Sequence, residues 1–532
     1  MIHRNPSVAM FAPVFCAALL VAAPSSAAPC TGLSGLALPH ASVTSQVVPA
    51  GSLTIGSQVF SNLPAFCRVV GVSTPGPDSH IGFEVWMPAD GWNQRYQQAG
   101  NGGYAGAIPF GSLATALKLG YAAAGTDDGH TGGTATFAPG HHEKVIDFGF
   151  RALKETTDNA KAIIAAFYGS GPARSYFVGC SDGGREALME AQRFPEDFDG
   201  ISAGAPANDW THLFTGFIFN EQALFADPAS KVGPEKLPAI QRAALAQCDL
   251  LDGIADGVLN DPRQCRFDPA TIQCRGAETN DCLTGAQVTA VRKIYAGPRN
   301  PRTGGQIFPG YEAGAEAAPG GWSAWITGPL PIAGSPTIQA FFGNQFFTNI
   351  IYEDPAFDFT KLNFDYDVSF ADNTTAGTIN STSADLSRFK AHGGKLLQWH
   401  GWDDPAIAPR SSINYFERVV AAQSSGEGDE ALERTQSFFR LFLAPGVLHC
   451  GGGPGPNVFD TLTPLVRWVE QGTAPERIVA TKFAGDNPAA KVLTTRPLCP
   501  FPQFAEYTGR GNTNDATNFV CREHGDGSES GQ

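Results

Sequence analysis

Short apolar runs alternate with amphipathic segments in two parts of the chain, residues 80–210 and the stretch after residue 390. The apolar runs have the length of buried strands, and the segments between them repeat apolar residues at the spacing of a helix. This alternation predicts an α/β fold with a mostly parallel central sheet covered on both faces. The expected strands are 81–87, 120–124, 175–178, 395–399 and 438–443, and the expected helices are 158–168, 184–194 and 460–470.

Between about residues 207 and 390 the pattern changes to acidic loops and Gly/Pro-rich segments that hold four cysteines. This texture predicts an inserted lid rather than more of the sheet. Aromatic side chains are concentrated in residues 341–370. They either line a ligand pocket or form the lid's own core, and the second is the better expectation for any single ring. The expected segments are a signal peptide (1–28), a first part of the core (29–206), the lid (207–390) and a second part of the core (391–532).

The first 28 residues have the organisation of a secretory signal peptide. His3 and Arg4 precede an apolar stretch, 9–23, and small residues at 25–28 supply a cleavage site after Ala27 or Ala28. The apolar stretch is shorter than the roughly 20 residues that cross a membrane, and no later apolar segment is long enough. We expect an exported protein, secreted or periplasmic, with no membrane partner.

Composition narrows the class of protein further. Hydrophobic residues make up 42% of a chain of 532 residues, which is enough to bury a large core and excludes disorder. The net charge is -15 and there is no run of Lys or Arg, so no nucleic-acid partner is expected.

Export places the cysteines in an oxidising compartment. The chain has 11 cysteines, and loss of Cys16 with the signal peptide leaves an even number. Short spacings suggest local disulfides, and the CxxC spacing of zinc sites is absent. The expected local pairs are Cys30–Cys67, Cys248–Cys265, Cys274–Cys282 and Cys499–Cys521, which leaves Cys180 and Cys450.

The segment Gly179-Cys180-Ser181-Asp182-Gly183 matches the pattern G-x-S-x-G. It follows a predicted strand and precedes a predicted helix, as a nucleophile elbow requires, and a helix N-terminus favours developing negative charge. The alternative is an ordinary glycine-rich turn, because the bare pattern often occurs by chance. The flanking strand and helix favour Ser181 as a nucleophile.

A serine nucleophile needs a base and an acid that orients the base. In α/β-hydrolases these follow in the order Ser, Asp/Glu, His, on loops after later strands. One such loop is His400-Gly401-Trp402-Asp403-Asp404-Pro405, and the next strand leads to His449-Cys450. We expect His449 to be the base and His400 to be a structural histidine.

The two unassigned cysteines adjoin the predicted nucleophile and base. If Ser181 and His449 are within hydrogen-bond reach, Cys180 and Cys450 are close enough for a disulfide. Such a bond would fix the loop that bears the base to the elbow that bears the nucleophile. We therefore expect a fifth disulfide, Cys180–Cys450.

The Cys-Ser … Asp … His-Cys arrangement resembles the tannase and feruloyl esterase family of α/β-hydrolases, which also includes the enzyme that hydrolyses mono(2-hydroxyethyl) terephthalate. The resemblance runs over most of the mature chain and includes residues 179–186, 400–405, 449–450 and 496–500. It implies an α/β-hydrolase fold with a large inserted lid domain. It also places the acid at Asp404, with Asp403 as the alternative.

An esterase of this kind needs two backbone N–H donors for the oxyanion. One is expected from Asp182, directly after the nucleophile. The other is expected from the glycine-rich loop 100–106, where Gly103 is favoured and Gly102 is the alternative. A plain turn or a phosphate loop would also be rich in glycine, but neither phosphate-binding pattern is present.

An acidic loop lies between Cys248 and Cys265. Carboxylates at its spacing, with interleaved glycines, suit a hard cation that takes about six to eight oxygens, although the spacing is not that of an EF-hand. The alternative is a solvated acidic turn. The family resemblance implies a structural Ca²⁺ ion in the lid. Its ligands would be the side chains of Asp249, Asp252 and Asp256 and the carbonyls of Ile254 and Val258.

Together these features predict a secreted serine carboxylesterase that hydrolyses esters of aromatic acids through an acyl-enzyme. The resemblance favours hydroxycinnamic, feruloyl-type esters, then tannase-type galloyl esters, then terephthalate monoesters. Ile407, three residues after Asp404, is aliphatic where an aromatic residue would better clamp a flat ring. Two other classes stay open: a catalytically silent hydrolase-fold binding protein, and a secreted peptidase with the same three residues.

Overall fold

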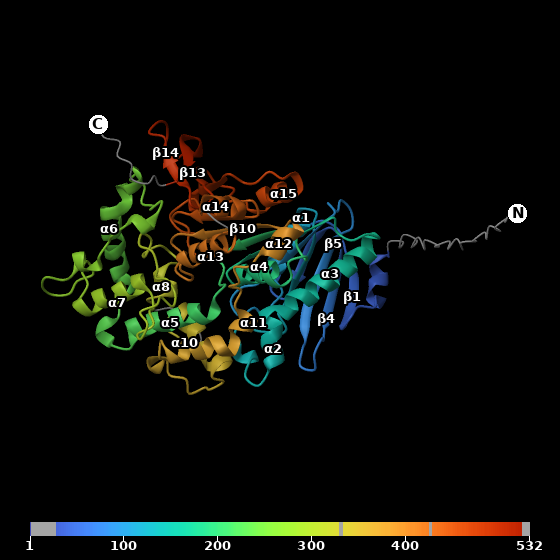
Figure 1. The fold of residues 1–532 in the computed structure, drawn as a ribbon, viewed down its shortest axis with the longest axis horizontal. Coiled ribbons are helices and arrows are strands. Elements are labelled where there is room, and N and C mark those ends of the chain that lie inside the picture. Colours follow the sequence, from blue (N-terminus) through green and yellow to red (C-terminus); the bar gives the residue numbers. More distant parts are fainter. Residues whose placement is uncertain (2–27, 329–333, 425–427, 524–532) are drawn as a thin grey trace.

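The computed structural model describes residue 1 and residues 28–328, 334–424 and 428–523. Its centre is a nine-stranded sheet (Figure 1). From one edge to the other the strands are β1 (Ala41–Val48), β4 (Phe66–Ser73), β5 (Ile81–Pro88), β7 (Ala122–Thr126), β6 (Arg95–Ala99), β8 (Arg174–Cys180), β9 (Gly200–Gly204), β10 (Lys395–Gly401) and β11 (Phe439–Ala444). The pairings from β1 to β7 are antiparallel, and those from β7 to β11 are parallel.

The parallel half of the sheet confirms the fold predicted from the pattern. β7 and β9 are buried along their whole length, as expected of parallel strands with helices on both faces. The five expected strands are present as β5, β7, β8, β10 and β11. The expected set leaves out four strands of the sheet: β1, β4, β6 and β9. β1 is largely exposed, β6 and β9 are short and hold mostly polar or small residues, and Arg68 interrupts the apolar run of β4.

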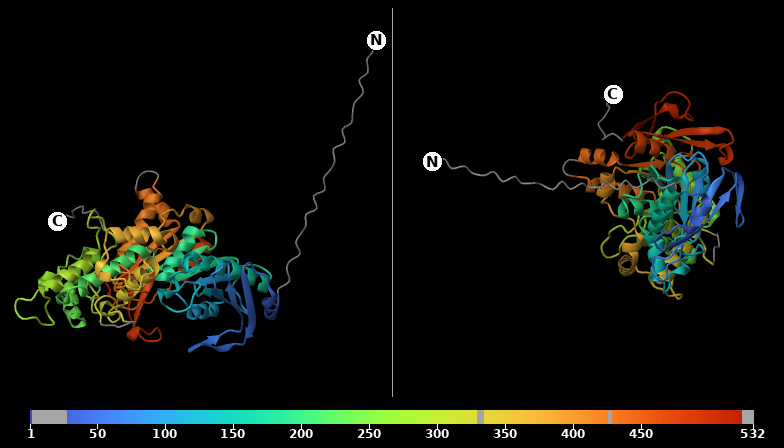
Figure 2. Two further views of the ribbon diagram at one scale, coloured as in Figure 1. Left: turned by 90° about the horizontal axis from the view of Figure 1, so that it is seen from below. Right: turned by 90° about the vertical axis from the view of Figure 1, so that its right-hand side faces the viewer.

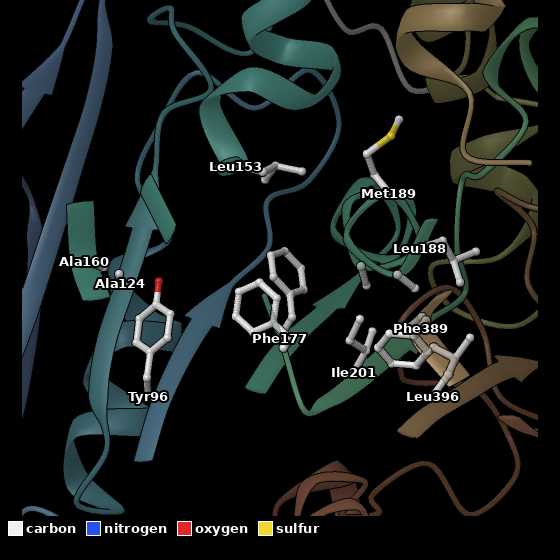
Figure 3. Packing of buried hydrophobic residues seen from close by; sticks show 14 of the residues in the cluster. Tyr96, Ala124, Leu153, Ala160, Phe177, Leu188, Met189, Ile201, Phe389 and Leu396 are labelled. Atoms are coloured by element: carbon white, nitrogen blue, oxygen red, sulfur yellow. The ribbon is translucent and has the colours of Figure 1, made fainter. Parts of the chain in front are cut away.

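Helices cover the sheet on both faces, and each face has its own apolar cluster. On one face lie α3 (Ala152–Tyr168), α4 (Asp182–Arg193) and α13 (Arg410–Ala422), and on the other lie α1 (Phe110–Lys118) and α15 (Leu462–Gln471). Figure 3 shows part of the first cluster, in which Leu153 and Leu188 of the helices lie near Phe177 and Ile201 of the strands. Full burial of each such side chain contributes about 1.5–3 kcal/mol. The three expected helices are present as α3, α4 and α15.

The residues described between β9 and β10 add no strand to the central sheet. They supply most of a third large apolar cluster and lie at the opposite end of the molecule from β1 and β4 (Figures 1 and 2). We call residues 207–390 the lid region. Its helices are α5 (Trp210–Phe225), α6 (Leu237–Cys248), α7 (Gly285–Ala296), α8 (Trp322–Trp325), α9 (Ile338–Phe346), α10 (Tyr366–Ala371), α11 (Gly377–Ile379) and the start of α12 (Ser387–His392).

Smaller elements complete the described chain. They are the helices α2 (His142–Ile146) and α14 (Gly428–Gln436) and the hairpins β2 (Gly51–Ile55) with β3 (Gln58–Leu63), β12 (Ile478–Phe483) with β13 (Val492–Leu498), and β14 (Phe504–Tyr507) with β15 (Phe519–Arg522). The last two hairpins follow α15, so the end of the chain extends beyond the predicted strand–helix alternation. None of the helices described here is long and apolar enough to cross a lipid bilayer.

Five disulfides confirm the predicted pairing. They are Cys30–Cys67, Cys180–Cys450, Cys248–Cys265, Cys274–Cys282 and Cys499–Cys521. The predicted signal peptide falls on residues that lie, except for its ends, outside the described part of the chain.

Candidate active site

Ser181 occupies a tight turn between β8 and α4. Its φ is 66° and its ψ is -121°, a combination that residues with a side chain rarely adopt. A Cβ atom on Gly179 would lie 2.2 Å from the carbonyl oxygen of Gly183, so the turn requires glycine there. The strand, turn and helix therefore have the geometry of a nucleophile elbow.

Ser181, His449 and Asp404 form a continuous hydrogen-bonded chain. Ser181 Oγ lies 2.8 Å from His449 Nε2, and His449 Nδ1 lies 2.8 Å from Asp404 Oδ2. The three residues follow β8, β10 and β11, so they meet at the carboxyl edge of the parallel strands. The structure thus brings together the residues that the sequence names as nucleophile, base and acid.

Asp404 is buried, and each of its oxygens has a hydrogen-bond partner. Oδ1 accepts the N–H groups of Ala406 at 2.8 Å and Ile407 at 2.9 Å, and Oδ2 lies 3.1 Å from His400 Nε2. Burial opposes ionisation, but His449 and His400 hold the pKa of Asp404 well below its usual range. An ionised Asp404 favours the His449 tautomer with the proton on Nδ1, which leaves Nε2 free to accept one.

Two neighbours of Asp404 have different surroundings. Burial and the nearby Glu316 and Glu312 raise the pKa of Asp403 well above its ordinary value, so this carboxyl is poorly suited to stabilise a cationic imidazole. His400 is buried, with Nδ1 2.7 Å from Ser412 Oγ, as expected of a structural histidine. Its contact with Asp404 is a feature that the sequence does not predict.

The Cys180–Cys450 disulfide connects the elbow to the loop that carries His449. The two Cα atoms are 6.0 Å apart although 270 residues separate them in the chain. Each cysteine is the immediate neighbour of one member of the Ser181–His449 pair. The bond therefore limits movement of the histidine loop relative to the elbow.

The glycine-rich loop 100–106 lies against the elbow. Gly183 N–H donates to the carbonyl of Asn101 at 2.8 Å. Gly102, Gly103 and Asp182 line the same cavity as Ser181, and their N–H groups have no acceptor among the described residues. These groups are available to bind an oxyanion. The donors expected at Asp182 and Gly103, with Gly102 as the alternative, stay a prediction.

The cavity beside Ser181 and His449 has a volume of about 340 Å³, within the range of small-molecule sites. Apart from Ser181, Asp182, His449 and the indole N–H groups of Trp210 and Trp325, the described lining residues have no polar side chain. The lid region supplies six of the larger side chains: Trp210, Leu213, Phe214, Phe217, Trp325 and Phe342. The Trp325 ring lies edge-on to His449, with 5.1 Å between ring centroids.

The sequence points to only part of this apolar lining. Within the aromatic-rich segment 341–370, Phe342 lines the cavity, whereas Phe346 and Phe347 pack in the core of the lid region. The rings from α5 and α8 are not predicted, because apolar residues on helices look like core residues in sequence. Ile407, the aliphatic residue singled out after Asp404, also lines the cavity.

The predicted calcium loop lines one side of a second cavity of about 130 Å³ through Asp252, Ile254, Asp256 and Val258, and Lys482 and Arg496 line this cavity as well. Asp249 lies close by, and its carboxylate accepts the N–H of Gly257 at 3.0 Å. Burial, together with Asp256 and Asp249, raises the pKa of Asp252 to about 6. A divalent cation would relieve this cost, and the oxygen donors are those that Ca²⁺ prefers. One contact competes with metal binding, the 2.6 Å pair of Arg496 with Asp256.

A different acidic cluster lies beneath the elbow. Carboxylate oxygens of Asp128, Asp182 and Glu186 lie within 4.8 Å of one another. Their partners are donors: Arg185 Nε lies 2.5 Å from Asp182 Oδ1, and Asn101 donates to both Asp128 and Glu186. Guanidinium and N–H partners favour protons and an ion pair over a metal ion. Nothing in the sequence pattern points to this cluster.

Comparison with known proteins shows which protein family the chain belongs to. The family described as tannase and feruloyl esterase matches residues 67–522, most of the chain. The chain belongs to this family. An uncharacterized esterase of Xanthomonas campestris pv. campestris is 48% identical over 95% of this chain and 92% of its own length. Mono(2-hydroxyethyl) terephthalate hydrolase of Piscinibacter sakaiensis is 34% identical over 86% of this chain and 85% of its own.

A solved structure agrees with the family assignment. Feruloyl esterase B from Aspergillus oryzae has a TM-score of 0.83 at 28% identity, over 92% of this chain and 98% of its own. The match confirms the resemblance seen in the sequence and the α/β-hydrolase fold. The protein is an esterase of the tannase and feruloyl esterase family, a class of carboxylic ester hydrolases.

Proposed function

We propose that this esterase hydrolyses esters of aromatic carboxylic acids through an acyl-enzyme, with Ser181 as nucleophile, His449 as base and Asp404 as acid. The observation that carries the proposal is the pair of 2.8 Å contacts that link Ser181 Oγ through His449 to Asp404 beside an apolar cavity. The order of the three residues in the chain is that of α/β-hydrolases.

The proposed reaction has two halves that use the same groups. Ser181 Oγ attacks the ester carbonyl as its proton passes to His449 Nε2, and the oxyanion accepts hydrogen bonds from Asp182 and from Gly103 or Gly102. The alcohol leaves with the proton from His449, and a water molecule then repeats the sequence on the acyl-enzyme. Asp404, ionised, stabilises the imidazolium and fixes its orientation. A single oxyanion donor contributes about 100- to 1,000-fold to such rates.

The lining of the cavity supports the order of substrate classes. A terephthalate monoester carries a carboxylate, and among the lining residues that the structure describes there is no Lys or Arg to pair with it. A galloyl ring has three hydroxyl groups, and each one buried without a partner costs about 1–3 kcal/mol. A hydroxycinnamoyl group presents a longer and more apolar body to Trp325, Phe342 and Phe214. We therefore place feruloyl-type esters first, galloyl esters second and terephthalate monoesters third.

We further propose that residues 207–390 act as a lid domain on a core formed by 29–206 and 391–532. A structural Ca²⁺ ion held by Asp249, Asp252, Asp256 and the carbonyls of Ile254 and Val258 would neutralise the loop's charge. Pro445 and Arg496 line the same cavity, so the ion would tie the lid region to the end of the chain that bears His449. The five disulfides and the predicted signal peptide support a secreted or periplasmic location.

A substrate panel tests the proposal on purified mature protein. Methyl ferulate should be hydrolysed with the highest kcat/KM, then methyl gallate, then mono(2-hydroxyethyl) terephthalate, and a peptide anilide should not be cleaved. Ser181→Ala should lower turnover at least about 1,000-fold with an unchanged melting temperature. Absence of turnover on every ester would favour the silent binding protein. Cleavage of the peptide in preference to all esters would favour the peptidase.

A further inference from the structure

Asn101 lies directly before Gly102 in the glycine-rich loop 100–106, and two buried carboxyl groups accept hydrogen bonds from it. Its backbone N–H donates to Glu186 Oε2 at 2.8 Å, and its side-chain amide donates to Asp128 Oδ2 at 2.9 Å. Its carbonyl accepts the N–H of Gly183 at 2.8 Å. The position of the loop relative to the elbow therefore depends on where Asp128 and Glu186 lie.

The two carboxyl groups have one oxygen each that is not used by Asn101. Asp128 Oδ1 and Glu186 Oε1 are buried and have no hydrogen-bond donor in the described part of the chain. Both residues are 0% exposed. Two ionised carboxylates this close, shielded from water, would repel each other strongly.

One cation in the described part of the chain, Arg185, lies close to Asp128 and Glu186, but its hydrogen bonds go to other groups. Arg185 binds Asp182 through both oxygens, at 2.5 and 3.2 Å, and donates to the carbonyl of Gly149 at 2.7 Å. Its nearest approach to Glu186 is 4.0 Å. Three carboxyl groups and one guanidinium leave an excess of negative charge, and a proton between Asp128 and Glu186 removes part of it.

We propose that Asp128 and Glu186 are positioning residues for ester hydrolysis: they share one proton and in that state hold Asn101, so that the N–H groups of Gly102 and Gly103 face the developing oxyanion. This inference rests on the proposed function, because it requires the oxyanion to form at loop 100–106. In this proposal Asp128 and Glu186 act through Asn101 and the oxyanion donors, and not on the ester itself.

The surroundings of the pair favour the shared proton at neutral pH. Burial, and then the neighbouring Glu186, raises the pKa of Asp128 well above its ordinary value, and burial with Asp182 raises the pKa of Glu186 to about 7. The other titratable groups that the structure describes beside the pair, His130 and Arg185, add no free cation. Burial lowers the pKa of His130, whose nitrogens lie near the carbonyls of Tyr104 and Asp128, and Arg185 is paired with Asp182.

The first test removes the acceptor of the Asn101 N–H. Glu186→Leu should lower kcat about 100-fold with KM changed less than about 3-fold, because a shift near 1 Å in catalytic geometry costs roughly that much. Glu186→Gln should restore kcat to within about 3-fold of wild type at pH 7, since its amide oxygen still accepts from Asn101 and its NH₂ group donates to Asp128.

Glu190→Leu is the matched control. Glu190 lies one turn further along α4, is 0% exposed, and its carboxyl oxygens have no donor among the described residues. No hydrogen bond or ion pair joins Glu190 to loop 100–106 in the described part of the chain. The control should keep the wild-type kcat, with melting temperatures measured for all variants.

A pH profile tests the shared proton itself. Loss of this proton above neutral pH leaves two adjacent negative charges, so wild-type kcat should decline at alkaline pH. Glu186→Gln cannot lose the proton, and its alkaline decline should move up by at least about one pH unit. The double variant Asp128→Asn with Glu186→Gln should behave in the same way, and it provides the test if Glu186→Leu does not fold.

Several results would overturn the inference. They are equal kcat losses for Glu186→Leu and Glu190→Leu, a loss in Glu186→Leu confined to KM, failure of Glu186→Gln to restore kcat, or an alkaline decline unchanged in the glutamine variants. Ser181→Ala separates this outcome from failure of the proposed function. If Ser181→Ala retains activity, the proposed function fails whatever Glu186 shows. If Ser181→Ala is inactive while Glu186→Leu keeps full kcat, the positioning role alone fails.

Discussion

The cavity beside Ser181 has two walls. The core wall contains Gly102, Gly103, Ser181, Asp182, Ile407 and His449, and the lid wall contains Trp210, Leu213, Phe214, Phe217, Trp325 and Phe342. The residues of the two walls are held in place in different ways. On the core wall the side chains of Ser181, His449 and Asp404 have specific hydrogen-bond partners. Asp404 alone has contacts with His449, His400 and the N–H groups of Ala406 and Ile407. On the lid wall, rings such as Trp325 and Phe342 make van der Waals and aromatic contacts, and no hydrogen bond of either ring is found among the described residues. Hydrogen bonds fix direction, whereas apolar packing fixes mainly volume.

This difference separates the two tasks of an ester hydrolase. The core wall is suited to bond making and proton transfer, which tolerate little misplacement. The lid wall is suited to selecting the acyl group by size and polarity. Changes on the core wall should therefore affect kcat, and changes on the lid wall should affect the ratio between substrates.

The largest expected effect is on the acid of the core wall. Asp404→Asn should lower kcat by about 10,000-fold, because an amide no longer holds the His449 tautomer in which Nε2 accepts a proton. Asp403→Asn is the matched control, one residue away, and should lower kcat less than about 10-fold. Steady-state kinetics on methyl ferulate measures both. A more severe loss in Asp403→Asn would show that the acid is assigned to the wrong residue.

The next effect tests whether the core wall is braced covalently. Changing Cys180 and Cys450 together to Ala should lower kcat up to about 100-fold with a smaller change in KM. The free energy of unfolding should fall by about 2–5 kcal/mol. The control changes Cys274 and Cys282 together to Ala, which removes a disulfide in the lid region away from Ser181. A control variant with the same loss of kcat would remove the bracing argument.

Calcium removal tests how the lid region is joined to the end of the chain that bears His449. Excess chelator should lower the melting temperature, since an ion at a hundredfold excess over its Kd stabilises the native state by about 2.7 kcal/mol. Asp252→Ala or Asp256→Ala should reproduce this shift, while the exposed Asp281→Ala should not. An unchanged melting curve, with metal analysis showing no bound calcium, would dismiss the site.

The smallest expected effect is on the lid wall. Phe342→Ala should lower kcat/KM for methyl ferulate about 10-fold but leave a small acetyl ester nearly unaffected, because only the larger acyl group reaches the ring. Phe341→Ala, at the adjacent residue that does not line the cavity, is the control. Equal losses on the ferulate and acetyl esters would show that this wall does not select the acyl group.

The same contrast explains how much could be predicted from the sequence. Ser181 and His449 each follow a strand, so their positions could be inferred from the strand pattern and the chain order. The choice of Asp404 over Asp403 as the acid came from the family resemblance. Cys180 and Cys450 adjoin two of them, and the five predicted disulfides are confirmed. Local pattern therefore predicts the core wall well.

Features that depend on contacts between distant elements escaped prediction. Trp210 and Phe214 lie on an apolar helix, where nothing in the sequence separates a cavity ring from a core ring. Asp128 and Glu186 come from a loop and a helix that the fold alone brings together. The exposed strand β1 lacked an apolar run. In each case the decisive information is tertiary packing.

The central claim is that Ser181 is the nucleophile, and covalent labelling tests it most directly. The purified esterase would be treated with a fluorophosphonate, digested, and mapped by mass spectrometry alongside Ser181→Ala. We predict one phosphonyl group per chain, on Ser181, in proportion to the activity lost, and no label on the variant. Loss of activity with the label on another residue, or a Ser181→Ala protein that is labelled and still hydrolyses methyl ferulate, would contradict the account.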